Sequence, residues 1–217
     1  MAHTISHAPH TEGRVIHWAA RYDLLIPLFT FGQVHRVRRR IADLAQAKPG
    51  DAVLDVGCGP GDLALVLAER VGPTGTVAGI DPSPEMIARA RQKAQRRQVA
   101  ADFRVEPVEA LSFADQSFDA VVSSFAFHHL PGDLKPRALA SMARVLKPGG
   151  LVCIVDFMPS ADQRRAAMST DMQALSDLLG EAGFQDIIGG RRLPSMGFLV
   201  GLLGIAPPGS VSARKAS

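Results

Sequence analysis

Cysteine is scarce in this 217-residue chain, which contains only Cys58 and Cys153. One lies in a glycine-rich stretch and the other in an apolar run, so a disulfide framework is not expected and a reducing compartment fits. The histidines near the N-terminus have no cysteine or acidic partners, and we expect no metal site. The first ten residues, MAHTISHAPH, lack the basic and apolar regions of a secretory signal. These features together predict a cytoplasmic protein.

Long apolar runs are also missing. No uninterrupted stretch of about 18 apolar residues occurs, which argues against a membrane-spanning helix. Hydrophobic residues nevertheless make up 47% of the chain, enough for the core of one domain of ordinary size. We expect one soluble globular unit.

Acidic residues are slightly outnumbered by basic ones, and the net charge is +3. The arginines gather between residues 36 and 40 and again between residues 89 and 97. Such clusters are typical of solvated helix faces, but they would also attract an anionic membrane or an acidic substrate. No zinc-finger spacing or basic-aromatic sheet motif accompanies them, so nucleic acid is not expected as a partner. Peripheral membrane contact is left open.

From residue 52 onward, short runs rich in Val and Ile alternate with helical patterns, which predicts βα units and a parallel sheet. The predicted strands are Ala52–Val56, Thr76–Ile80, Asp102–Glu106, Asp119–Ser124 and Leu151–Phe157. Helices are predicted at about Asp62–Val71, Pro84–Arg97, Leu134–Leu146 and Asp171–Ala182. After Gly183, the extended segments Gln185–Arg192 and Gly197–Leu203 follow each other with no room for a helix between them. They predict a C-terminal antiparallel hairpin.

The stretch VLDVGCGPG holds the first candidate binding residues. An apolar strand containing Asp55 runs into Gly57, Gly59 and Gly61, which let the backbone turn sharply and approach a ligand. Dinucleotide-binding proteins seat a pyrophosphate on a similar turn, but their G-x-G-x-x-G pattern requires glycine where this chain has Asp62. A cofactor without phosphates and with a cationic amino-acid end fits better, because Asp55 can hold an ammonium group. S-adenosylmethionine is such a molecule.

A second acid stands at the end of the next predicted strand. Asp81, twenty residues after Gly61, can accept hydrogen bonds from both ribose hydroxyls of a nucleoside. Both cofactor classes use an acid here, so it is the combination with Asp55 and Asp62 that favours the methyl donor. Met86 either packs near the adenine or ribose or belongs to the core, and both roles are left open.

Four motifs occur in the order VLDVGCGPGDLAL, VAGIDPSPEMIARAR, SFDAVVSSFAFHHL and RVLKPGG. In this order they resemble class I S-adenosylmethionine-dependent methyltransferases, over roughly residues 15 to 190. The resemblance implies a Rossmann-like α/β fold with a seven-stranded, mostly parallel sheet, helices on both faces and the C-terminal antiparallel hairpin. More narrowly, WAARYDLLIPLFTFGQVHR followed by KPGDAVLDVGCGPGDLAL is similar to ubiquinone/menaquinone-biosynthesis C-methyltransferases, whose lipid-amine N-methyltransferase relatives start similarly.

The resemblance also implies roles for individual residues. On the donor side, the resemblance assigns the methionine loop to Asp55, Gly57, Gly59 and Gly61. It assigns the ribose acid to Asp81, the position after strand four to Ser124, and a tyrosine that closes over the cofactor to Tyr22. Relatives carry an acid for the adenine amino group where this chain has Pro107, so we expect the backbone of Val108 and the side chain of Glu109 to serve instead. The quinone-pathway relatives carry an arginine-asparagine pair where this chain has His128 and His129.

The domain boundaries follow from the same comparison of patterns. We expect an N-terminal helical lid segment at residues 1–40, the S-adenosylmethionine-binding domain at residues 41–206 and a disordered tail at residues 207–217. Ligands of open α/β sheets bind outside the carboxyl ends of the strands, where an apolar N-terminal segment carrying Tyr22 could close. Packing of that segment against a sheet edge is the alternative.

Methyl transfer from a sulfonium is an in-line displacement from an activated donor, so positioning and exclusion of water matter more than a dedicated base. His128 and His129 follow strand four, where the donor methyl should point. His129 is the first candidate to orient the acceptor or take its proton, with His128 and Tyr22 after it. Helix capping and packing are the alternatives for the two histidines, and Asp156 is either a second candidate or a structural acceptor.

The function expected is transfer of a methyl group from S-adenosylmethionine to a small, lipophilic or aromatic acceptor. A phospholipid-amine N-methyltransferase, a non-catalytic S-adenosylmethionine-binding module and an NAD-dependent oxidoreductase are the competing hypotheses. The acceptor and the methylated atom depend on pocket shape, which the motifs do not encode. Monomer and homodimer are equally compatible with the sequence.

Overall fold

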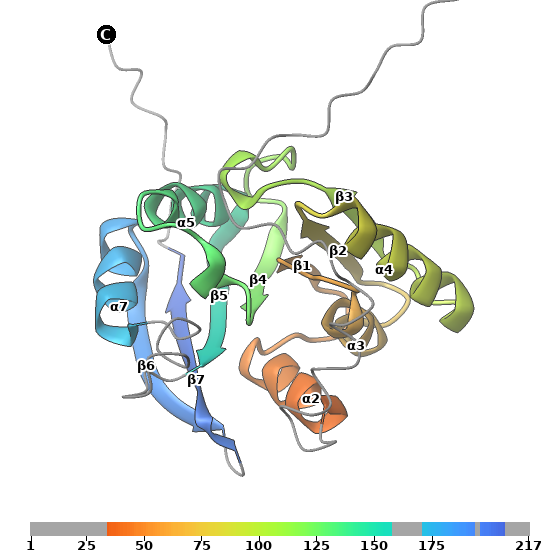
Figure 1. Ribbon diagram of the computed structural model, residues 1–217, viewed down its shortest axis with the longest axis horizontal. Helices are drawn as coiled ribbons and strands as arrows, with labels where there is room; N and C mark the ends of the chain where they lie inside the picture. Colours follow the sequence, from red (N-terminus) through yellow and green to blue (C-terminus); the bar gives the residue numbers. More distant parts are fainter. Residues whose placement is uncertain (1–33, 158–170, 194–195, 207–217) are drawn as a thin grey trace, which may run out of the picture.

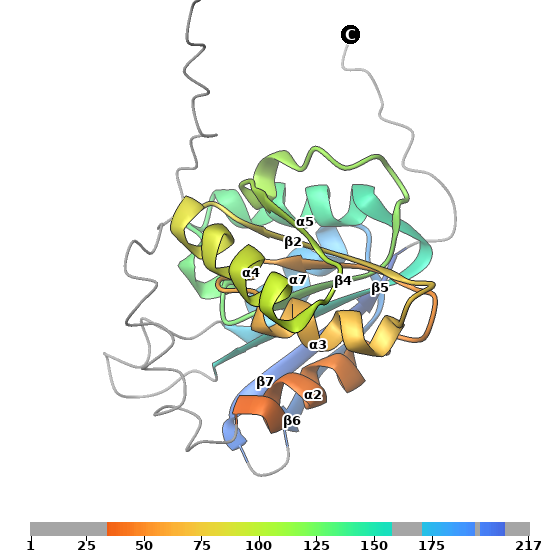
Figure 2. The ribbon, with the colours of Figure 1, turned by 90° about the vertical axis from the view of Figure 1, so that its right-hand side faces the viewer.

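The computed structural model describes residues 34–157, 171–193 and 196–206. They form one seven-stranded sheet of order β3-β2-β1-β4-β5-β7-β6, with helices on both faces (Figures 1 and 2). The strands are β1 Ala52–Val56, β2 Thr76–Asp81, β3 Asp102–Val105, β4 Phe118–Ser124, β5 Leu146–Phe157, β6 Gln185–Leu193 and β7 Met196–Ile205. The α-helices are α2 Val34–Leu44, α3 Asp62–Val71, α4 Pro84–Arg97, α5 Leu134–Val145 and α7 Met172–Glu181, and the short 3-10 turns are η1 Val108–Ala110 and η2 Phe127–His129.

The sheet has the predicted topology. Strands β1 to β5 pair in parallel, while β7 pairs antiparallel with both β5 and β6. The Rossmann-like α/β architecture and the C-terminal hairpin are thereby confirmed. The order reverses at β1, so the chain crosses from one half of the sheet to the other next to the glycine-rich loop. Ligands of such folds bind at this crossover, outside the carboxyl ends of the strands.

Two apolar layers hold the sheet between its helices. One cluster joins the sheet to α2, α3 and α4, and includes Ile41, Leu65 and Ile87, each fully buried. The other joins the opposite face to α5 and α7 through residues such as Leu139 and Leu179. Figure 2 shows the two sets of helices on either side of the strands. With both faces covered, the parallel strands read as almost continuous apolar runs.

Helix α2 crosses the boundary at residue 40 that the sequence suggested between lid and domain. Its apolar face packs into the core through Val37 and Ile41, whose side chains are 2% and 0% exposed. The part of the predicted lid that precedes α2 lies outside the described residues, and so does the predicted tail. Both stay predictions.

Strand β5 differs most from its predicted bounds, since it begins at Leu146 and not at Leu151. The pairing with β4 shifts register between Phe118 and Ala120, which lets the strand absorb the Pro-Gly-Gly stretch. Gly149 has a φ of +77° and donates its N–H to Ala206, which closes the turn against the last strand. Proline and two glycines predict a loop by propensity, but here pairing with the neighbouring strands keeps these residues in the strand.

Candidate functional site

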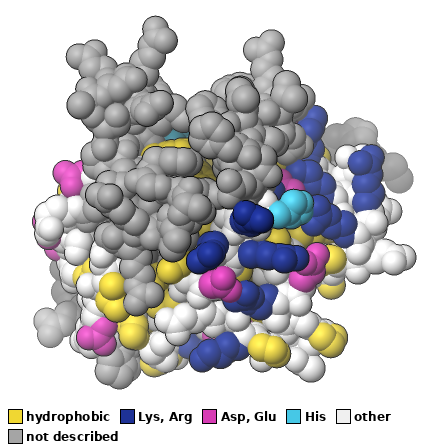
Figure 3. All heavy atoms as spheres, turned by 90° about the horizontal axis from the view of Figure 1, so that it is seen from below, with side chains coloured by type: hydrophobic (Ala, Val, Ile, Leu, Met, Phe, Trp, Pro, Cys, Tyr) yellow, Lys and Arg dark blue, Asp and Glu magenta, His cyan; other side chains and the backbone are white. Residues whose placement is uncertain are grey.

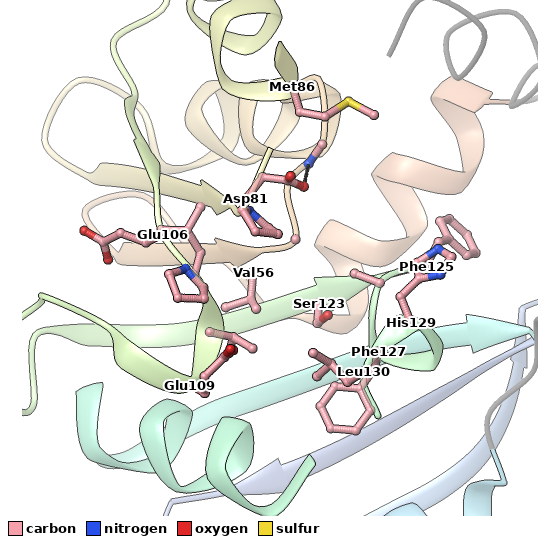
Figure 4. Close-up of a pocket in the computed structure, with 17 residues that line it drawn as sticks. Val56, Asp81, Met86, Glu106, Glu109, Ser123, Phe125, Phe127, His129 and Leu130 are labelled. Atoms are coloured by element: carbon pink, nitrogen blue, oxygen red, sulfur yellow. Dashed lines mark hydrogen bonds between the residues drawn. The ribbon is translucent and has the colours of Figure 1, made fainter. Parts of the chain in front are cut away.

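A pocket opens at the carboxyl ends of β1, β2, β3 and β4, where the fold predicts a ligand site (Figure 4). Asp81 and Met86 form one side of it and Ser123 lies on the opposite side. Figure 4 also shows its two ends, with Glu106 and Glu109 at one and Phe125 and His129 at the other. Part of the predicted site, on the donor side and on the acceptor side, is thus brought to one pocket.

The glycine-rich loop contributes Gly57 and Gly59 to the pocket lining. Their φ angles are +69° and +52°, in the region that side chains with a Cβ rarely adopt. A Cβ on Gly57 would lie 2.4 Å from that of Ala126, so this residue also lets the β1 and β4 loops meet.

Gly61 has a different task from the one the resemblance implies. It does not line the pocket, and a Cβ there would come within 2.7 Å of Ala90 and 2.9 Å of Phe103. It therefore permits close packing of the loop against α4 and β3. A role for Gly61 in cofactor binding stays a prediction.

Asp81 braces the loop as well as lining the pocket. One carboxylate oxygen accepts the N–H of Gly59 at 3.0 Å, and the other accepts the N–H of Ser83 at 2.9 Å. Burial raises the pKa of this carboxyl above its usual range, while the two N–H donors act in the opposite direction. Carboxylate oxygens have several lone pairs, so both can still accept hydrogen bonds from a neighbouring diol.

Asp55 is fully buried beneath the loop, and neither carboxylate oxygen meets a donor at hydrogen-bond geometry among the described residues. Burial raises its pKa to about 7, the backbone N–H of Ala64 acts in the opposite direction, and the nearby carboxylate of Asp81 adds to the rise. An ionised carboxylate in such a place is costly without a cationic partner. Asp55 does not itself line the pocket, and its predicted contact with an ammonium group stays a prediction.

Ser123 is a pocket residue that sequence reasoning missed. It is 1% exposed, its Oγ has no hydrogen-bond partner in the described part of the chain, and it pairs with Val56 across the sheet. The predicted residue was its neighbour Ser124, which is absent from the lining. Successive strand residues point to opposite faces, and the sequence did not show which serine faces inward.

The far end of the pocket is formed by the turn after β3. Val108 and Glu109 line it as expected, and Glu106 and Pro107 join them. Met86 both lines the pocket and is 2% exposed, so its two proposed roles are compatible. An acid-rich turn of this kind can accept hydrogen bonds from an amino group, and its proline offers an apolar surface.

The two adjacent histidines, His128 and His129, have different surroundings. The backbone N–H of His128 donates to one oxygen of Asp156 at 3.0 Å, and its Nδ1 lies 2.7 Å from the other oxygen. Both side chains are buried, so Asp156 fastens the η2 turn to the end of β5. His129 instead lines the pocket, with its ring centroid 3.9 Å from that of His128. His129 is placed to face a ligand and His128 to position the turn.

Asp62 contradicts part of the electrostatic argument made from the sequence. Its carboxylate contacts Arg38 at 3.1 Å and Lys93 at 2.9 Å, and it does not line the pocket. Because two cations compensate its charge, it repels a pyrophosphate less than predicted. The case for a phosphate-free cofactor rests more on the buried Asp55.

Some predictions fall outside the described residues, notably the closing role of Tyr22. Within residues 34–157, 171–193 and 196–206, no cluster of three or more His, Cys, Asp or Glu residues is arranged to hold a metal ion. Over the same ranges, no helix combines the length and apolar character needed to cross a bilayer.

Comparison with known proteins agrees with the site. Residues 53–150 match a family model described as a methyltransferase domain. The demethylmenaquinone methyltransferase of Thermus thermophilus is 44% identical over 141 residues, which cover 65% of this chain and 63% of that protein. The ubiquinone/menaquinone biosynthesis C-methyltransferase UbiE of Xanthomonas campestris is 41% identical over 142 residues, or 64% of this chain and 55% of the relative. The chain thus spans less than two thirds of the length of these relatives.

The chloroplastic 2-phytyl-1,4-beta-naphthoquinone methyltransferase of Arabidopsis thaliana is also similar, at 41% identity over 144 residues covering 64% of this chain and 54% of that protein. Among solved structures, a SAM-dependent methyltransferase from Aquifex aeolicus superposes with a TM-score of 0.68 at 23% identity. That superposition covers 78% of this chain and 89% of the other. At this identity the structural likeness supports the fold alone.

Proposed function

We propose that this protein is a class I S-adenosylmethionine-dependent methyltransferase of the UbiE-like type and that it methylates a quinone-type acceptor. The match of residues 53–150 to a methyltransferase domain and the similarity to quinone methyltransferases support this proposal. The donor is S-adenosylmethionine, and the acceptor is a lipophilic aromatic ring such as a demethylated naphthoquinol. The observation that carries the donor assignment is the fully buried carboxylate of Asp55, which has no side-chain hydrogen-bond partner among the described residues and lies beneath a glycine loop that Asp81 braces. The names of the relatives support the acceptor class.

The donor side of the pocket accounts for each part of S-adenosylmethionine. Asp81 would accept hydrogen bonds from the ribose hydroxyls, and Gly57 and Gly59 would leave room for the methionine portion beside the loop. Asp55 would supply the negative charge for the ammonium group, with the Oγ of Ser123 as a further polar atom. The end of the pocket formed by Val108 and Glu109 would hold the adenine, with Met86 on the adjoining side.

The acceptor side is formed by the turn that follows β4. The bound donor supplies a methyl group activated by its sulfonium charge, so the protein must hold the acceptor in line and exclude water. Phe125 and Leu130 provide apolar surface for an aromatic ring, and His129 orients the acceptor or accepts its proton. His128 keeps that turn in place through Asp156. A role for Tyr22 in closing the site stays a prediction.

The function is tested by incubating the full chain with methyl-labelled S-adenosylmethionine and a demethylated naphthoquinol with a short prenyl chain. We expect label in the quinol, no label in phosphatidylethanolamine, and no binding of NADH by calorimetry. Donor binding without label in any acceptor of a quinol, phenol and amine panel would point to a non-catalytic module. Labelled phosphatidylethanolamine would instead support the lipid-amine activity.

A second arm of the same test addresses His129. The variant His129→Asn should lower kcat at least about a hundredfold, the low end for loss of an acid-base group, while the dissociation constant of the donor changes less than about threefold. His35→Asn is the matched control, because His35 is exposed on α2 and does not line the pocket. Equal turnover in the two variants would remove His129 from the mechanism.

The pKa of Asp55 makes donor affinity depend on pH. Without donor this carboxyl has a pKa of about 7, and a bound ammonium group stabilises its ionised form. Binding therefore releases a proton below pH 7, and affinity should fall by up to about tenfold per pH unit as the pH is lowered. Calorimetry between about pH 5.5 and pH 7.5 measures this slope.

The variant Asp55→Asn provides the control for this pH dependence. It should bind the donor more weakly at neutral pH and with a nearly flat pH profile, because the titrating charge is gone. A flat profile in the unmodified protein, or the same slope in the variant, would assign the ammonium group to another partner.

A further inference from the structure

The charge of this protein is distributed very unevenly. Helices α2, α3 and α4 together carry ten Lys and Arg residues against four Asp and Glu, a net charge of +6. The whole chain has a net charge of only +3, so the rest of it is acidic on balance. A concentration of one sign on a single layer of helices creates a long-range field that favours anionic partners.

Within this layer, we define the basic surface as Arg36, Arg39 and Arg40 of α2. All three are exposed, and no ion pair engages any of them within the part of the chain that the structure describes. Two acids of the layer are already paired with other cations, Asp62 with Arg38 and Lys93, and Asp43 with Arg70. Glu69 and Glu85 are the other acids on these helices, too few to balance the surface.

The arginines of α2 share one side of that helix. Arg36, Arg39 and Arg40 are spaced three and four residues apart, while Val37 and Ile41 point into the core. The apolar face of α2 is thus buried against the core, and the arginine side chains are on its exposed side. Any partner bound here must be held by electrostatics, not by insertion of apolar side chains.

The basic surface begins beside the pocket edge, because Arg38 of α2 contacts Asp62, the first residue of α3, directly after the glycine-rich loop. Strands β4 and β5 run downward in Figure 1, with α2 at the bottom. The view from below in Figure 3 therefore faces the carboxyl ends of these strands, and Lys and Arg side chains gather on this face. A flat anionic surface that contacts α2 would lie beside the pocket and not behind the sheet.

We propose that the basic surface docks the protein on the anionic headgroups of a lipid bilayer and thereby presents the pocket to its acceptor. This inference rests on the proposed function, because only a lipophilic acceptor would be supplied from the bilayer. Nucleic acid is the less suitable occupant, since α2 and α4 contain no Phe, Tyr or Trp on which bases could stack and carry a single imidazole ring, that of His35. The arginines also form a broad exposed patch, to which a flat array of phosphates is complementary.

Sedimentation of the full chain with vesicles tests the proposal. We expect binding to phosphatidylcholine vesicles containing about 30% phosphatidylglycerol, little binding to pure phosphatidylcholine, and release at about 0.5 M salt because the attraction is screened. These arms use the unmodified protein, so they do not depend on the folding of a variant. Equal binding to both vesicle types, or binding that survives the salt, would overturn the electrostatic docking.

The residues are tested by matched charge reversals. Arg36→Glu with Arg40→Glu should lower the partition coefficient on the anionic vesicles at least about twentyfold, since each basic residue near the surface contributes roughly fivefold. The control is Lys48→Glu with Arg137→Glu, two exposed cations outside α2, α3 and α4, which should change it less than about threefold.

The outcome is separable from the proposed function. Methyl transfer to a short-chain acceptor in vesicle-free solution reports the activity alone, and the α2 variant should retain it. Equal losses in both double variants, or a preference for duplex DNA over anionic vesicles at equal phosphate concentration, would overturn membrane docking. Failure of methyl transfer by the unmodified protein, with vesicle binding intact, would count against the activity and not against the surface.

Discussion

Gly59→Val should abolish binding of S-adenosylmethionine. Gly59 has a φ of +52°, which costs a β-branched residue roughly 1–3 kcal/mol, and its Cα faces the pocket where the methionine portion of the donor would lie. Its N–H also donates to Asp81, so a shift of the backbone to relieve strain would disturb the ribose acid. We expect no measurable heat of binding in calorimetry at donor concentrations that saturate the unmodified protein.

The matched control for this substitution is Gly149→Val. Gly149 has a φ of +77° and open space around its Cα, so the variant carries similar backbone strain far from the donor site. It should lose thermal stability but bind the donor within about threefold of the unmodified protein, since only strain is introduced. Wild-type donor affinity in Gly59→Val would show that the donor does not approach this loop.

The sequence predicted the strands, the helix and the glycine-rich loop around the pocket well, because local chemistry determines them. The strand, glycine loop and helix around Asp55 follow one another within a few residues, and positive φ angles at Gly57 and Gly59 are what the glycines implied. Strands β1, β2 and β4 were predicted to within one residue at each end, since continuous Val and Ile runs bounded by turns are typical of buried parallel strands. Asp81 was placed by its position at a strand end.

The acceptor half depends on contacts between distant parts of the chain, which the sequence does not reveal. His128 and His129 are adjacent, and only the hydrogen bond to Asp156, 28 residues away, decides which ring is anchored and which lines the pocket. The ion pairs of Asp62 likewise involve Arg38 and Lys93 on other helices. Long-range pairing of this kind is the part of a fold that local patterns cannot specify.

Asp81→Ala should weaken the binding of S-adenosylmethionine by roughly 1.5–3 kcal/mol, or about ten- to hundredfold in dissociation constant. Two effects contribute to this loss. The ribose hydroxyls lose a charged acceptor, and the N–H groups of Gly59 and Ser83 lose the oxygens that now hold the loop and the turn before α4. The variant should therefore also unfold at a lower temperature. A change below about threefold in the dissociation constant would show that the ribose is held elsewhere.

The two effects can be separated with S-adenosylhomocysteine and its 2′-deoxy form, compared by calorimetry in both proteins. If Asp81 contacts the ribose, removal of the hydroxyl should weaken binding at least about fivefold in the unmodified protein and hardly at all in Asp81→Ala, because contacting groups are not additive. If the carboxylate only braces the loop, the hydroxyl should matter equally in both proteins. Asp81→Asn retains one acceptor oxygen, so only one of the N–H groups of Gly59 and Ser83 keeps its partner. Its unfolding temperature should therefore lie between those of the unmodified protein and Asp81→Ala.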